Sequence, residues 1–271
     1  MQSNNPVLSR YEKSDKSGFA YQEGVNAYTQ AAAGGAGAAD VDTAFQQITA
    51  AGGARLTIND VIIKSLAVFG LTVIFAFVGW NTAESMPWLL WVGMLGGLAL
   101  GFVNALKKVP SPPLILLYGV LQGIFLGSIS YMYSYIAEGI VLQAVVATMV
   151  TFGVMLTLYT TGIIKVTKKF QSIMIVALVS YVVLGIGNLI WALFGGGDGW
   201  GIYGTGFGPI VAVLGVLLAA FFLLLDFEAI SQGIKLGAPE RESWRMAFGL
   251  LVTLIWLYLE FLRLLAILNR S

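Results

Sequence analysis

A few ionisable side chains lie inside long apolar runs of this 271-residue sequence, and they are the residues best placed to do chemistry. Asp226 and Glu228 lie in one run, and Glu260 and Arg263 lie in the run that follows it. A charge at the middle of a membrane costs about 2.5–3.5 kcal/mol on insertion scales, so such groups face the interior of a helix bundle and mark ion or proton paths. Glu228 is expected to reach the membrane interface, because it lies close to the end of its run.

Asp226 and Glu260 are the candidate pH sensor and ion pathway. If the two carboxyl groups meet in the bundle, they cannot both ionise cheaply, so they hold one proton between them and titrate as a unit. A deprotonated pair also binds a hard cation such as Ca²⁺ or Na⁺. This interpretation has a geometric difficulty, because counting along the two runs at ~1.5 Å per residue leaves the carboxyl groups roughly 15 Å apart in depth. Tilt, a kink at Gly249 or a deep start of the last run would close that gap.

Arg263 supports a second interpretation of Glu260. It follows Glu260 by three residues and shares its helical face, so the two are charge partners in an intrahelical ion pair. Such a pair offsets two insertion costs and needs no further function. The sequence alone leaves both interpretations open.

Composition excludes several classes of function. Hydrophobic residues make up 58% of the chain and charged residues 11%, against about a quarter charged in an average soluble domain. Cysteine and histidine are absent, which removes disulfides, thiolate nucleophiles, haem ligation, His-based general bases and nearly all zinc sites. We therefore expect no enzyme, no cofactor and no resident metal. The net charge of +1 indicates no nucleic-acid partner.

Apolar runs long enough to cross a bilayer, which takes ~20 residues, follow one another from residue 57 onward. This predicts an all-α, polytopic membrane protein with a lipid bilayer around it. The runs are Val61 to Trp80, Trp88 to Leu106, Leu114 to Ile136, Ile140 to Ile164, Ile173 to Phe194, Phe207 to Ile230 and Met246 to Leu268. Asn59 and Asp60 are the predicted caps of the first helix.

Basic residues predict the orientation, because cytoplasmic loops collect Lys and Arg. Thirteen of the fifteen precede or begin the first run or follow the second, fourth and sixth runs, whereas the other breaks carry Glu84, Glu138 and Asp198. Lys64 is expected to reach the interface from the first turn. Residues 1–55 read as a disordered cytoplasmic tail and residues 56–271 as the transmembrane domain. In a cell membrane this places the N-terminus in the cytoplasm and the C-terminus outside.

Glycines at four-residue spacing predict close helix contacts. Gly119, Gly123 and Gly127 repeat along the third run, and Gly97 and Gly101 along the second. Small residues at this spacing let neighbouring backbones approach. The alternative is that these glycines shape a pore.

Several stretches resemble the Bax inhibitor family, the transmembrane proteins with a Bax-inhibitor motif, in its bacterial type. They are Leu257-Tyr258-Leu259-Glu260-Phe261-Leu262-Arg263-Leu264-Leu265, Leu225-Asp226-Phe227, the glycine-rich Gly119 to Ser130, and Leu158-Tyr159-Thr160-Thr161 with Lys168-Lys169-Phe170. The resemblance covers the third to seventh runs and leaves the first 55 residues out. It implies a seven-transmembrane-helix bundle around a central last helix, and a pH-sensitive calcium leak channel gated by an acidic pair that maps to Asp226 and Glu260. Glu260 stands where the family usually has Asp.

Three other classes of function remain as alternatives. A membrane-embedded regulator would bind a membrane protease or another membrane complex, with the tail as its handle. An intramembrane aspartyl protease would use Asp198 of Gly195-Gly196-Gly197-Asp198 together with Asp226, although that glycine-rich stretch reads as an external loop. A proton-coupled transporter is disfavoured because no inverted repeat of interrupted helices is evident.

Overall fold

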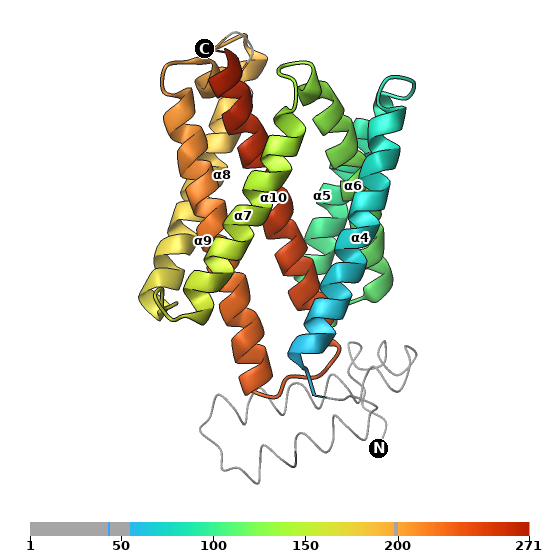
Figure 1. Ribbon diagram of the computed structural model, residues 1–271, viewed down its shortest axis with the longest axis vertical. Coiled ribbons are helices and arrows are strands. Elements are labelled where there is room, and N and C mark those ends of the chain that lie inside the picture. Colours follow the sequence, from blue (N-terminus) through green and yellow to red (C-terminus); the bar gives the residue numbers. More distant parts are fainter. Residues whose placement is uncertain (1–42, 44–54, 198–199, 271) are drawn as a thin grey trace, which may run out of the picture.

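Seven helices long and apolar enough to cross a membrane make up the described part of the chain (Figure 1). The structure is a computed structural model that describes residue 43 and residues 55–197 and 200–270. The helices are α4 (Ile58–Thr82), α5 (Trp88–Leu106), α6 (Pro112–Ser134), α7 (Ile140–Thr160), α8 (Lys168–Leu193), α9 (Gly208–Lys235) and α10 (Glu242–Arg270), with a short 3-10 helix, η1 (Gly201–Gly204), between α8 and α9. The prediction of an all-α, seven-span membrane protein is confirmed.

Four helix bounds differ from the predicted runs by four or five residues, and one of them is the start of α8 at Lys168, ahead of the predicted Ile173. α7 ends at Thr160, before the predicted Ile164, because the chain turns at Gly162 with φ 71° in the left-handed region. α9 continues to Lys235 and α10 begins at Glu242. The long segment between Asp226 and Glu260 is therefore mostly helix, joined by a loop of six residues (Leu236 to Arg241).

The first helix is capped by a residue other than those predicted. The Thr57 hydroxyl accepts a hydrogen bond from the Asp60 backbone N–H at 3.3 Å, and the Asp60 carboxylate accepts one from the Thr57 backbone N–H at 3.0 Å. This reciprocal capping box satisfies two donors that the first turn otherwise leaves open. Asp60 thus takes part as the third residue of the helix, and Thr57, not Asn59 or Asp60, is the cap.

The glycines of α6 lie directly against α4. A Cβ at Gly123 would overlap the backbone carbonyl oxygen of Thr72, and one at Gly127 would overlap that of Ala76. Gly79 of α4 makes the reciprocal approach to the backbone of Ile124. The interpretation of the glycine ridge as a helix contact, rather than a pore lining, is confirmed for these positions. Gly97 of α5 likewise faces Gln122 of α6, whose amide nitrogen lies 2.7 Å from an ideal Cβ.

The last helix is central, as predicted. α10 packs against α4, α6, α7 and α9, and Figure 1 shows it crossing between the α4–α6 group and the α8–α9 pair. Its buried residues join two cores. Phe248, Leu251 and Ile255 pack with Val68 of α4 and Tyr118 of α6. On the other face, Leu257 packs into a cluster with α9 and α7.

The α9–α10 loop lies at one end of the bundle, and the residues just before α4 are held to it by a backbone contact. We call this contact the strap. The Leu56 backbone N–H donates to the Ala238 carbonyl oxygen at 2.7 Å, and the backbones of Arg55 and Pro239 form an isolated antiparallel β-bridge. Leu56 is 3% exposed and packs against the start of α4 and the end of α9.

Lys64, which was predicted to reach the interface, has a charged partner in the structure. Its ammonium lies 2.7 Å from the Glu240 carboxylate of the α9–α10 loop. The starts of α4, α6, α8 and α10 and the ends of α5, α7 and α9 all lie at this end (Figure 1). The breaks rich in Lys and Arg therefore share one end of the bundle.

Two predicted features lie outside the described residues. They are Asp198, which the aspartyl-protease alternative requires, and the tail up to residue 54 except Thr43.

Candidate functional site

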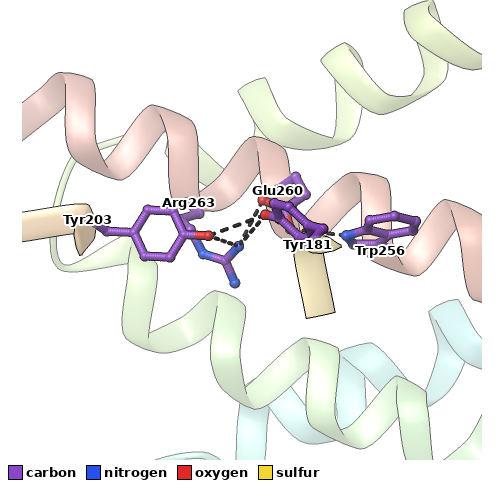
Figure 2. A network of polar contacts seen from close by, with 5 residues as sticks. All are labelled: Tyr181, Tyr203, Trp256, Glu260 and Arg263. Atoms are coloured by element: carbon purple, nitrogen blue, oxygen red, sulfur yellow. Dashed lines mark hydrogen bonds and ion pairs between the residues drawn. The ribbon is translucent and has the colours of Figure 1, made fainter. Parts of the chain in front are cut away.

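Glu260 lies at the centre of a polar network inside the bundle (Figure 2). Its side chain is 2% exposed, and three donors reach it. The Arg263 guanidinium donates to Oε2 at 2.8 Å, while the Tyr181 hydroxyl and the Trp256 indole donate to Oε1 at 2.8 and 3.0 Å. The carboxylate is therefore both charge-paired and hydrogen-bonded, which is what a buried charge needs to be stable.

Two tyrosines extend the network from other elements. The hydroxyls of Tyr181 on α8 and Tyr203 on η1 lie 3.2 Å apart, and Arg263 donates to both, at 3.4 and 3.3 Å. The proton of Tyr181 points to Glu260, so Tyr203 must donate to Tyr181. Arg263 also lies over the Tyr203 ring, 4.7 Å from its centre, in a cation–π contact. Glu260 thus accepts directly from Arg263, Tyr181 and Trp256, and Tyr203 joins the network through Tyr181 and Arg263.

A glycine on α9 makes room for this carboxylate. An ideal Cβ at Gly215 would lie 2.6 Å from Glu260 Oε2 and would overlap the Tyr181 hydroxyl. Any larger residue here would displace the network. The site is therefore built from α8, α9, α10 and η1 together.

Asp226 lies elsewhere on α9 and in a different environment. Its carboxylate faces Gly249 of α10, where an ideal Cβ would be 3.5 Å from Oδ1, and the hydroxyl of Thr253 lies beside it. Oδ2 is buried and has no hydrogen-bond partner within the part of the chain that the structure describes. A buried carboxylate oxygen without a partner is costly when charged, so it marks a place where a proton or a cation would be stabilised.

The structure does not bring Asp226 and Glu260 into contact. Glu260 lies at the level of Gly215, and Gly215 precedes Asp226 by eleven residues on α9, or ~16 Å along the helix axis. The same spacing separates Gly249 from Glu260 on α10. This matches the separation expected from counting, and α10 continues as a helix through Gly249.

Arg263 lies where the second interpretation of Glu260 placed it, and Glu228 lies apart from this pair, near the end of α9. Arg263 forms the predicted ion pair with Glu260. Glu228 accepts from the Tyr159 hydroxyl at 2.9 Å near the end of α7, and from the Gln232 amide at 2.6 Å on its own helix. Its carboxylate is thus held at the basic end of the bundle, away from Asp226's contacts with α10.

Sequence reasoning found Arg263 but missed the other side chains of the network around Glu260. Trp256 could have been found, because it precedes Glu260 by four residues and so shares its face. Tyr181 and Tyr203 come from other elements and carry no local signal in the sequence. Among the described residues, no group of three or more acidic side chains is placed to hold a metal ion.

Comparison with known proteins adds a family. A model of the family described as Bax inhibitor 1 like matches residues 5–270. The match begins well before the first span, so the expectation that the first 55 residues lie outside the resemblance is wrong. No curated protein matches the chain.

Proposed function

The chain belongs to the Bax inhibitor 1 like family, and we propose that this multi-pass membrane protein is a pH-sensitive cation leak channel. Calcium is the proposed cation, and Asp226 and Glu260 are the proposed proton-sensing carboxylates. The proposal is one of ion passage and involves no enzymatic step. It places the protein in a cell membrane with its basic end and N-terminus in the cytoplasm.

The observation that supports it best is the unpartnered Oδ2 of Asp226. Inside a span, such an oxygen is stabilised by binding a proton or by meeting a cation. When it is protonated, the α9–α10 contact at Gly249 and Thr253 is neutral and closed. When it is ionised, the charge attracts a hard cation and disfavours the tight contact.

The two carboxylates act in series in this proposal. Glu260 is already paired with Arg263, and the pair as a whole carries little net charge. Protonation therefore changes the local electrostatics most at Asp226. A cation moving along the α9–α10 interface would meet the two levels one after the other, ~16 Å apart. Arg263 then limits passage at the Glu260 level by keeping that carboxylate neutralised.

Calcium entry into proteoliposomes, measured across about pH 6 to 8, tests the proposal. Asp226→Asn keeps the shape and removes the proton switch, so the dependence of flux on pH should flatten. Glu228→Gln is the matched control, because this acid lies on the same helix with its own partners outside the path. An unchanged pH profile in Asp226→Asn would contradict the sensor, and absence of flux in the wild-type protein would contradict the channel.

A further inference from the structure

A cavity of about 600 Å³ lies over α10, lined by α4, α6, α7 and α10. Its walls include Phe69 and Phe77 of α4, Val145 and Met149 of α7, and Leu251 and Ile255 of α10. A smaller cavity of about 180 Å³ continues it toward the basic end and shares Phe69, Met149, Leu251 and Leu254 with it. Together they form one groove, which we call the α4–α7 groove.

The hydroxyl groups that line the main cavity all have hydrogen-bond partners within the protein, whereas the hydroxyl of Ser65, which lines the smaller cavity, is buried and has no partner among the described residues. Thr72 donates to the Val68 carbonyl at 2.9 Å and Thr148 to the Ala144 carbonyl at 2.7 Å, each on its own helix. Ser130 donates to the Leu126 carbonyl at 2.5 Å and pairs with the Tyr258 hydroxyl at 2.6 Å. The main cavity therefore presents methyl, methylene and ring carbons, and it has no charge to complement.

Its surroundings decide what can fill it. The groove lies within helices that cross the membrane, and neighbouring residues of α4 and α7 such as Ile74 and Val146 are exposed and apolar, so the adjoining medium is bilayer hydrocarbon. Water gains no partners in an apolar cavity and leaves it dry. A transmembrane helix, about 10–12 Å across and ~30 Å long, occupies several times the volume.

We propose that the α4–α7 groove is a binding site for one acyl chain of a membrane phospholipid. The volume falls in the range of about 300–1,000 Å³ that small-molecule sites have, and the uncharged walls select an aliphatic occupant. The bound chain rests on Leu251, Leu254, Ile255 and Tyr258 of α10. It thus supports the helix that carries Glu260, on the face opposite the α9 contact.

Two adjacent valines on α7 give a matched test. Val145 lines the groove and is 41% exposed, whereas Val146 is 52% exposed and is not among the lining residues. We would purify wild type, Val145→Trp and Val146→Trp from the same membranes and count retained phospholipids by native mass spectrometry after stepwise delipidation. We expect one retained lipid in wild type and in Val146→Trp. Val145→Trp should retain about tenfold less, because the indole takes the space of several methylene groups.

A second variant keeps the test decisive if Val145→Trp folds poorly. Ala76→Leu fills the groove from the α4 side with a smaller side chain and should lower retention in the same direction. Equal retention in all variants would overturn the proposal. So would a dimer that Val145→Trp dissociates, since the occupant would then be a second copy. Labelling of a cysteine at position 148 by a water-soluble, membrane-impermeant thiol reagent would also overturn it, by showing that the groove is filled with water.

Discussion

Glu260 and Arg263 lie one turn apart on α10 with 2.8 Å between the carboxylate and the guanidinium, and the acid is far more buried, at 2% side-chain exposure against 30%. The Glu260 carboxylate is therefore the more deeply buried member of the pair. Its loss should be asymmetric, because a stranded charge inside the bundle is worse than a lost pair.

The first prediction follows from that asymmetry. Arg263→Met leaves the more deeply buried Glu260 carboxylate without its counter-charge and should destabilise the protein by about 3 kcal/mol or more, a larger loss than Glu260→Gln causes. The double change Glu260→Gln with Arg263→Met removes both charges and should recover much of that loss. Thermal unfolding of the detergent-solubilised variants measures both. Additive losses in the double variant would mean that the two side chains are not coupled.

The second prediction concerns the contact between α4 and α6. Gly127→Ala should strongly destabilise the bundle, because the new Cβ would overlap the Ala76 carbonyl and force the two helices apart. Gly153→Ala is its control on α7, where nothing lies within 4 Å of an ideal Cβ. That change should be neutral or slightly stabilising, since alanine favours helix. Similar unfolding temperatures for the two variants would argue against the glycine ridge as a packing determinant.

The third prediction is the orientation of the bundle. The chain has no cysteine, so single cysteines report accessibility without background. In intact cells a membrane-impermeant thiol reagent should label position 138 and leave position 168 unlabelled until the membrane is permeabilised. Labelling at 168 alone would reverse the assignment.

The fourth prediction compares the contribution of the tail to stability with that of the strap. Deleting residues 1–50 should leave the unfolding temperature nearly unchanged, because the stretch has no apolar stripe to offset the entropy of ordering it. Leu56→Ala should instead cost about 2 kcal/mol or more, as a buried leucine does. A deletion that destabilises the protein as much as Leu56→Ala would place part of the tail in the packed structure.

The spans were predictable because each is a continuous apolar run, and such a run satisfies its backbone hydrogen bonds inside a bilayer by forming a helix. The α4–α6 contact was predictable for a similar reason, since Gly123 and Gly127 recur on one helical face. The ends of the helices were less predictable. By residue type, Asn59 and Asp60 are as suitable for capping as Thr57. The choice of Thr57 depends on the backbone geometry at that position.

The candidate site was only half predictable. Charges inside the spans pointed to Asp226 and Glu260, and three-residue spacing pointed to Arg263. Tyr181 and Tyr203 could not be found this way, because they reach the network around Glu260 through the packing of α8 and η1 against α9. Whether two carboxylates on antiparallel helices meet depends on the depth of each helix, which the loop between them sets and apolar patterning does not.

The strap between Leu56 and Ala238 also has a consequence for biosynthesis. Its two halves leave the ribosome about 10–40 s apart at typical rates of translation, and six of the seven spans are made before Ala238 appears. The α4–α6 contact can assemble much earlier, once α6 has been inserted. A chain stalled before Ala238 would therefore have a packed first half, while the residues leading into α4 would not yet be tethered. In this protein, tethering of that entry is a late event that distinguishes a finished chain from a nascent one.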